Sequence, residues 1–171
     1  MNRTISEVNG TLVQESVGIV GEYDVKVVRA DGSIEVKKIS NIVTRRGLNR
    51  LASRAINGTG NSVAFVLAVG TFTTAASMDS TAFGECGSSR KVAATIVQSQ
   101  EWFALTMTWA GFVDGLAAIA IDAVSILDHA SSGQGTSFNI ANGLGVTLQN
   151  SDFLNLTGRI RVGSHNLGHT S

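Results

Sequence analysis

The sequence predicts a mainly β fold: an antiparallel β-sandwich of about eight or nine strands, with one α-helix at about residues 44–56 packed on it. Short runs of alternating apolar and polar residues recur at spacings near ten residues, which is typical of sandwich strands. One stretch, residues 41–58, instead carries its apolar residues at helical spacing. The chain has no proline, and 19 glycines are available for its turns.

The first strands form a predicted β-hairpin. The run "EYDVKVVRA" (22–30) alternates around Tyr23, Val25 and Val27. The run "SIEVKKI" (33–39) alternates around Ile34, Val36 and Lys38. Asp31-Gly32 lies between the two runs, and Asp-Gly between alternating runs is a strong hairpin signal.

The helix follows the hairpin. Apolar residues recur at intervals of three and four along "NIVTRRGLNRLASRAING" (41–58), which places them on one helical face. Thr44 is the predicted N-cap, and Asn57-Gly58 is the predicted end of the helix.

The remaining strands are expected after the helix. "SVAFVLAV" (62–69) is a short apolar run typical of a buried strand, and residues 70–85 are expected to form a loop of small residues. Later strands are predicted at 91–98, 101–111, 136–140, 145–149 and 155–163. The run 116–127 has no clear period and could be a helix or a strand, and its bounding glycines and β neighbours favour a strand. We expect a shared core of helix and strand residues, made of Leu48, Leu51, Ala55, Phe65, Leu67, Val69, Leu156 and Ile160.

The composition favours one domain that associates with neighbours. No linker, repeat or charge block divides residues 1–171, and residues 1–21 are expected to form an extended N-terminal arm. Only 15% of residues are charged, against a typical figure of about 25%. A surface with few charges is typical of one that other subunits cover, so we expect a homo-oligomer or an assembly.

No catalytic, metal-binding or cofactor-binding motif is recognisable. His165 and His169 are four residues apart but lie in a tail without a helical face, so no metal pair is expected there. Asp114 and Asp122 interrupt the most apolar stretch, which argues against a membrane span, and they are expected at strand ends rather than as a catalytic pair. Cys86 has no second cysteine to pair with and is expected to be a packed or loop thiol. We therefore predict a protein that is not an enzyme and has no cofactor or metal ion.

Four arginines on the predicted helix form the candidate binding site. Six basic residues and no acidic residue occur between Lys37 and Arg54, although the net charge of the chain is zero. The row could be a solvated helix face, a contact for an acidic protein partner, or a contact for nucleic acid. A helix-turn-helix reader needs a helix just upstream, whereas a hairpin is expected there, so we predict no nucleic-acid partner. The residues of this row are Arg45, Arg46, Arg50 and Arg54.

Two segments resemble small structural proteins of tailed bacteriophages. Members of that group carry "N-(L/I)-V-T-x-x-G-L-x-x-L-A", then a strand reading "aLGTG" and a loop rich in threonine and alanine that ends in "D-T-x-L". This chain has "NIVTRRGLNRLA" at 41–52 and "AFVLAVGTFTTAASMDSTAF" at 64–83. It departs from the pattern at Phe72, where a second glycine is usual, and has "DAVSILD" in place of "E-A-G-L-F". The matching positions are Asn41, Val43, Thr44, Gly47, Leu48, Leu51, Ala52, Val69, Gly70, Thr71, Thr73, Thr74 and Asp79.

The resemblance implies a structural role in a virion. The expected function is capsid decoration (cement) or an accessory of the neck or tail, and the alternatives are an adaptor that anchors a tail fibre or spike and a carbohydrate-binding module on the virion surface. The expected partners are a major capsid, neck or tail protein and further copies of this chain. The expected location is the virion, after synthesis in the cytoplasm of the host bacterium, with no membrane partner.

Overall fold

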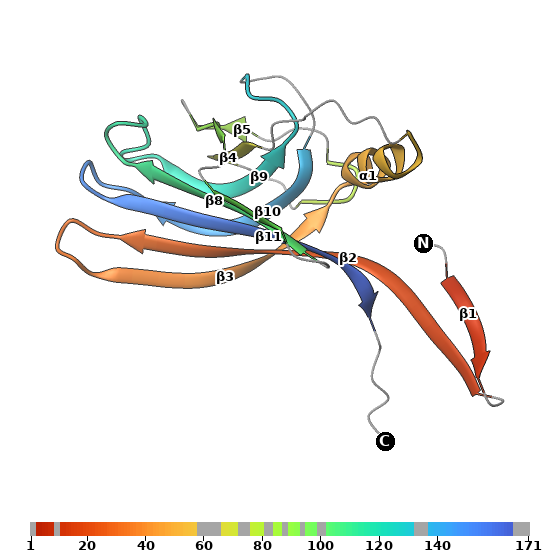
Figure 1. The fold of residues 1–171 in the computed structure, drawn as a ribbon. Helices are drawn as coiled ribbons and strands as arrows, with labels where there is room; N and C mark the ends of the chain where they lie inside the picture. The colour runs from red at the N-terminus through yellow and green to blue at the C-terminus, as the bar shows by residue number, and fades with distance from the viewer. Residues whose placement is uncertain are drawn as a thin grey trace.

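The computed structural model describes residues 3–8, 11–57, 66–71, 76–80, 84–86, 89–92, 95–98, 102–131 and 137–165. Within these ranges the chain forms eleven strands and one helix (Figure 1). In chain order they are β1 (Arg3–Val8), β2 (Thr11–Val28), β3 (Ile34–Val43), α1 (Arg45–Asn57), β4 (Val66–Thr71), β5 (Gly84–Glu85), β6 (Lys91–Val92), β7 (Thr95–Gln98), β8 (Trp102–Ala110), β9 (Ala120–Leu127), β10 (Ser137–Thr147) and β11 (Phe153–His165).

The strands form one antiparallel sheet that is curled into a half-barrel, so the predicted two-sheet sandwich is wrong. The strand order is β5-β4-β9-β10-β3-β2-β11-β8-β7, with β1 paired to β2 and β6 paired to β4. β3 joins the two halves because it pairs with β2 along 34–41 and with β10 at Ile42 and Val43. Because β3 pairs with strands of both halves, the hydrogen-bonded ladder continues from one half to the other and the sheet stays single. A sandwich and a curled sheet both need strands of alternating apolar and polar residues, so this alternation in the sequence does not distinguish them.

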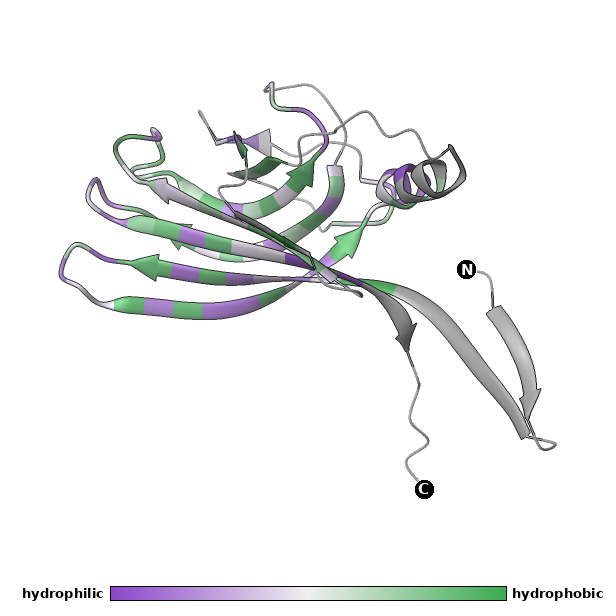
Figure 2. Cartoon of the chain, viewed as in Figure 1, coloured by the Kyte–Doolittle hydropathy of each residue, from purple (hydrophilic) through white to green (hydrophobic). Residues whose placement is uncertain are grey.

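The core lies on the concave side of the half-barrel. Tyr23, Val25 and Val27 are buried there, as the alternation along the first predicted strand indicates. Figure 2 shows hydrophobic and hydrophilic residues alternating along the strands of the sheet. Of the predicted core, Leu67, Val69, Leu156 and Ile160 are buried and Leu48 packs against them, whereas the side chains of Leu51, Ala55 and Phe65 lie outside the described ones.

A buried polar contact joins the two halves of the sheet across β3. The Tyr23 hydroxyl on β2 donates to Asn139 Oδ1 on β10 at 2.6 Å, and Ile126 N on β9 donates to the same oxygen at 3.0 Å. Burial raises the pKa of the Tyr23 phenol, so this hydroxyl keeps its proton and remains a donor. The contact connects strands that are neither neighbours in the sheet nor close in sequence.

Segment 89–92 crosses from one edge of the sheet to the other. β6 pairs with β4, yet Lys91 Nζ binds Asp114 Oδ2 at 2.6 Å and the carbonyl oxygen of Thr108, on β8, at 3.0 Å. Just before it, the carbonyl oxygen of Ser89 accepts the indole N–H of Trp109 at 2.8 Å. Side chains of the β8 region therefore hold this segment across the open side of the half-barrel.

The predicted hairpin is present, with a longer turn than two residues. Gly32 N donates to the carbonyl oxygen of Arg29 at 3.0 Å, and Arg29 N donates to that of Ser33 at 2.9 Å. Gly32 has a φ of 84°, the left-handed conformation that ends a three-residue hairpin loop with a bulge.

The apolar residues of β3 lie on both faces of the sheet. Ile34 and Val36 lie on the convex side and are 54% and 70% exposed, whereas Ile39 packs against the core and Val43 is buried. The alternating positions Ile34 and Val36 therefore do not mark the core side.

Several strand boundaries differ from those expected. β2 begins at Thr11 rather than near Glu22, and β1 pairs with its first residues, Thr11–Ser16. The resulting hairpin projects away from the half-barrel (Figure 1). Residues 137–147 form one strand instead of two. In the described part of the chain, no helix has the length and apolar character needed to cross a membrane.

Candidate functional site

Thr44 fixes the start of the helix. Its Oγ1 accepts the backbone N–H of Gly47 at 3.0 Å, which is the expected N-cap contact, and it donates to the carbonyl oxygen of Ser137 at 2.6 Å. The backbone N–H of Thr44 also donates to the carbonyl oxygen of Phe138 at 3.0 Å. One buried threonine therefore caps α1 and attaches it to β10.

Gly47 brings the first turn of α1 directly onto β10. A Cβ at this position would lie 2.2 Å from the carbonyl oxygen of Phe138, so only glycine fits. Gly70 has the same role elsewhere: its Cβ would lie 1.9 Å from the carbonyl oxygen of Gly84. Gly70 lies inside β4, where β5 approaches closely.

The arginine row is partly neutralised by acidic residues of the same chain. Arg45 Nε donates to Asp79 Oδ1 at 2.9 Å, with both side chains well exposed. Arg50 Nη2 lies 3.4 Å from Asp128 Oδ2. Arg46 is exposed and makes no salt bridge with the described residues, and the side chain of Arg54 lies outside them. Among the described side chains of the row, Arg45 and Arg50 therefore have acidic partners, and Arg46 between them has none.

Segment 76–80 lies against the start of α1. Arg45 N donates to the carbonyl oxygen of Met78 at 2.7 Å, beside the Arg45–Asp79 ion pair. Ala76 N in the same segment donates to Asn142 Oδ1 on β10 at 3.0 Å. Residues 76–80 therefore connect the start of α1 to β10.

An ion-pair cluster at the opposite end of the sheet could not be predicted from the sequence. Arg29 Nη1 donates to Asp152 Oδ2 at 2.9 Å and to the carbonyl oxygen of Thr147 at 2.7 Å, and Arg29 Nε donates to Glu35 at 2.8 Å. Asp152 also accepts the backbone N–H groups of Gln149 and Ala30. The Gln149 N–H and the Arg29 guanidinium hold the pKa of Asp152 below its usual value. This cluster fastens the β2–β3 turn to the β10–β11 turn.

The carboxylates considered for catalysis have separate structural partners. Asp114 accepts Lys91 and the backbone N–H of Ala110, whereas Asp122 accepts the backbone N–H of Gly145 at 3.0 Å. His129 Nδ1 accepts the backbone N–H of Ser131 at 3.1 Å, and His169 lies outside the described residues. The described part of the chain contains no group of three or more His, Cys, Asp or Glu residues that could hold a metal ion.

The lone cysteine is packed in the core. Cys86 is 5% exposed, and burial raises the pKa of its thiol. A thiol that keeps its proton is a poor nucleophile, so this environment fits the packed thiol that was expected.

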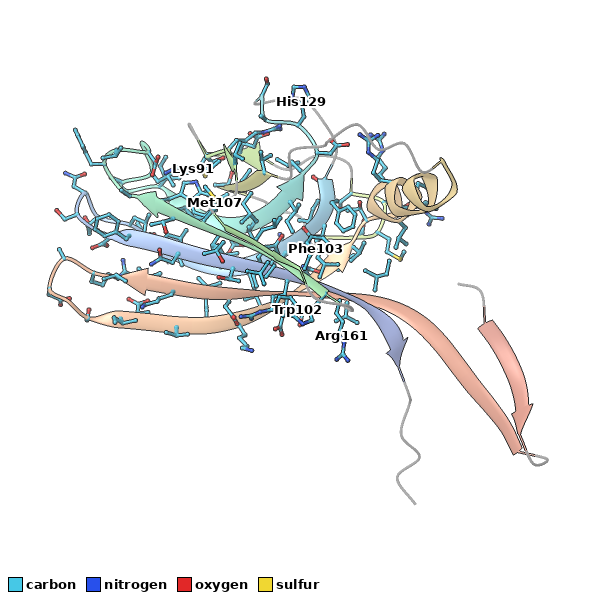
Figure 3. The ribbon with its side chains drawn as sticks, viewed as in Figure 1. Lys91, Trp102, Phe103, Met107, His129 and Arg161 are labelled. Carbon is cyan, nitrogen blue, oxygen red and sulfur yellow. The ribbon has the colours of Figure 1, made fainter. Side chains whose placement is uncertain are left out.

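Trp102 and Trp109 are seven residues apart and lie on opposite faces of β8, because successive residues of a strand point to opposite faces. Trp109 is fully buried, whereas Trp102 is partly exposed on the convex face. Trp102 lies opposite Arg161 of β11, and Figure 3 shows both on the side of the sheet away from Phe103 and Met107. The two indoles therefore cannot form one stacking platform.

An apolar patch lies at the end of the sheet with the Arg29–Asp152 cluster. Phe112 and Val113, in the β8–β9 turn, are 72% and 82% exposed, and Phe153 at the start of β11 is 46% exposed. The turn is attached to the chain beside Phe153, because Phe112 N donates to the carbonyl oxygen of Asn150 at 3.1 Å. This patch is a second candidate contact surface.

No protein-family model matches the chain, and neither a curated protein nor a solved structure matches it.

Proposed function

We propose that this chain is a non-enzymatic structural protein of a tailed-bacteriophage virion, acting as a capsid decoration protein or as an accessory of the neck or tail. The observation that carries the proposal is a contact between the two segments that resemble the phage proteins. Arg45, which follows the matching Thr44, binds Met78 and the matching Asp79. The second segment therefore lies against the start of the helix that the first segment forms.

The roles of the motif residues support a structural function rather than chemistry. Thr44 caps the helix, Gly47 allows the helix to contact β10, and Gly70 allows β5 to approach β4. Each of these roles concerns backbone geometry, and none places a nucleophile or an acid–base pair beside the others.

Association with other subunits is part of the proposal. The low charged fraction of 15%, the exposed apolar residues at one end of the sheet and the projecting β1–β2 hairpin are all features of a chain that contacts neighbours. We propose that the neighbours are further copies of this chain and a capsid, neck or tail protein, with Arg46 as the cation that faces an acidic surface on that protein.

Two alternatives lead to different outcomes. A fibre-anchoring adaptor would use the same surfaces in few copies at the tail. A carbohydrate-binding module would present aromatic side chains in a groove. The most exposed described aromatics, Phe112 and Phe153, lie at a turn and at the end of a strand, and Trp102 is only partly exposed, on the convex face. This location favours a protein contact over a glycan contact.

Antibody labelling of purified phage particles tests the proposal. Gold-labelled antibody against the chain should decorate the head under electron microscopy if the protein is a cement protein, and the neck or tail if it is an accessory. Label confined to the fibre attachment points would favour the adaptor. Particles that contain the gene but bind no label, with the protein left in the lysate, would contradict a virion role.

A further inference from the structure

An apolar row crosses four strands at one end of the sheet. Val28 of β2 pairs with Ile34 of β3 on one side and with Phe153 of β11 on the other. Phe153 in turn pairs with Ala110 of β8. Directly paired residues point to the same face of a sheet, with Cβ atoms about 5 Å apart. Because Val27 is buried in the core, Val28 and the residues aligned with it lie on the convex face, and we call these four residues the convex row.

The convex row is exposed although its residues are apolar. Ile34 and Phe153 are 54% and 46% exposed, and the other two residues are partly exposed. Val36, the next residue of β3 on this face, is 70% exposed. Figure 1 shows the β1–β2 hairpin at the opposite end of the sheet, so the hairpin of the same copy does not cover the row. A contiguous exposed apolar patch is typical of a contact surface.

Two charges of opposite sign lie on either side of the convex row. Lys26 is exposed on the convex face two residues before Val28, and Asp31 is exposed in the turn three residues after it. Among the described side chains, neither Lys26 nor Asp31 forms a salt bridge. In contrast, four other charged side chains of this face pair with one another: Glu22, Asp24, Lys38 and Arg159.

From this arrangement we propose that two copies of the chain form a two-fold dimer in which their convex rows pack face to face. The two-fold axis lies in the interface and runs along the row, so each row residue faces the same residue of the second copy and the strands of the two copies run in opposite directions. Lys26 lies about 7 Å before the row along β2, and Asp31 lies at most about 10 Å after it. The rotation therefore brings Lys26 of each copy beside Asp31 of the other.

The two charges favour a second copy as the occupant and select this axis. A surface that binds itself must carry both members of each charge pair, as this one does with Lys26 and Asp31. A two-fold axis parallel to the strands would place Lys26 level with Lys26 of the second copy rather than with Asp31. The contact uses the same surface on both copies, so the assembly closes as a dimer.

The contact is smaller than a standard interface. The row spans about 14 Å across four strands, whereas a standard interface buries about 800 Å² on each partner. We therefore expect a weak dimer of the isolated protein, which becomes more stable when copies are held close together on a particle. The inference specifies the self-association in the proposed function and rests on that part of it.

Charge exchange tests the pairing of Lys26 with Asp31. Analytical ultracentrifugation of the purified protein over a concentration series should show a mass that rises from 17.8 kDa toward twice that value, which gives the Kd of the dimer. Lys26→Asp or Asp31→Lys alone places like charges together at two symmetry-related contacts, so each should raise the Kd at least about tenfold. The double variant restores both pairs and should return the Kd to within about threefold of wild type. Asn49→Asp adds an acidic group at an exposed position of α1 and is the control, with an unchanged Kd expected.

Cross-linking tests the position of the axis. Ile34 faces itself across the axis, whereas the two copies of Val36 are about 14 Å apart along the strand direction. A short bis-maleimide should therefore join Ile34→Cys to itself and leave Val36→Cys monomeric, and the wild type gives the background because Cys86 is buried. Ile34→Lys should also produce monomer, whereas Val97→Lys, at a similarly exposed valine of β7, should still dimerise.

Three results would overturn the proposal. A wild-type mass that stays at that of one chain up to about 1 mM would show that the row does not bind a second copy. A double variant as weak as the two single variants would show that Lys26 and Asp31 do not meet. A covalent dimer from Val36→Cys rather than Ile34→Cys would place the axis elsewhere. All three measurements use purified protein, so their outcome is independent of whether the chain is found in particles.

Discussion

Thr44 is the residue on which the position of the helix depends most directly. Its hydroxyl accepts the Gly47 N–H and donates to the Ser137 carbonyl, and both bonds are buried. If the hydroxyl is lost, the helix end and the β10 carbonyl each lose a partner in a place that water reaches poorly.

We predict that Thr44→Ala lowers the free energy of unfolding by about 1–3 kcal/mol, because a lost cap costs about 1 kcal/mol and an unsatisfied buried group adds to it. Urea denaturation followed by circular dichroism measures the change. Thr44→Ser keeps the hydroxyl and should recover most of the loss. Equal stability of the alanine and wild-type proteins would show that these bonds contribute nothing.

Asp152 accepts hydrogen bonds from Arg29, from Ala30 N and from Gln149 N. Its pKa is lowered in the folded protein by the Gln149 N–H and by Arg29, from an ordinary value of 3.8. The folded state therefore binds a proton on this group less readily than the unfolded chain does. Its contribution to stability is complete above the unfolded pKa and disappears as the pH falls through the lower folded-state value.

We predict that Asp152→Asn destabilises the protein at pH 7 and that the difference from wild type shrinks as the pH is lowered through about 4 and below. Thermal unfolding at a series of pH values measures it. Asp79→Asn is the control, because Asp79 and its partner Arg45 are exposed and such a pair contributes less than about 1 kcal/mol. A difference between Asp152→Asn and wild type that does not vary with pH would contradict the assigned ion pair.

The sequence predicts local residue contacts but not distant ones. Thr44 and Gly47 are three positions apart, and the N-cap rule connects them directly. Tyr23 and Asn139 are separated by 116 positions, and Arg29 and Asp152 by 123. No periodicity relates such pairs, so they appear only when the sheet is assembled.

At the scale of elements, α1 has one face attached to the sheet. Its other face carries arginines, of which Arg45 and Arg50 are paired with acidic residues of other segments. The salt bridges of Arg45 and Arg50 with residues of the same chain leave Arg46 as the better candidate for an external partner. A substitution at Arg50 would also disturb Asp128, so its effect on a partner could not be separated from its effect on the fold.

We predict that Arg46→Glu changes the free energy of unfolding by less than about 0.5 kcal/mol but weakens attachment to particles that lack the protein. Co-sedimentation with such particles measures binding, and Lys26→Glu on the convex face of the sheet is the control. Unchanged binding by Arg46→Glu would mean that this helix face is only solvated. Binding of the wild type to bare DNA with a steep salt dependence would instead favour the nucleic-acid interpretation.

The elements with strong local signals are the ones that the sequence predicts well. The Asp-Gly hairpin and the helix are found where expected, because turn chemistry, capping and periodicity are local. The first part of β2 is missed, since residues 11–21 show no regular alternation. Residues 137–147 are read as two strands because glycines interrupt them, and in the structure Gly143 and Gly145 have positive φ within an irregular part of the β9–β10 pairing.

At the scale of the whole molecule, the strand that changes partner decides the architecture. The sequence predicts that the chain is mainly β, but it does not show that β3 pairs with β2 and then with β10. The half-barrel leaves two groups of apolar side chains exposed: Ile34 and Val36 on the convex side of β3, and Phe112 and Phe153 at one end of the sheet. These exposed features are the physical reason to expect neighbours.

The central claim is that the chain is a repeated component of a phage particle. The most direct test is the copy number of the chain in particles purified by density gradient and quantified by mass spectrometry against isotope-labelled peptides, with the major capsid protein as the internal standard. Hundreds of copies per particle are expected for head decoration, and six or twelve for a neck or tail accessory. Fewer than one copy per particle, with the protein recovered free in the lysate, would contradict the claim.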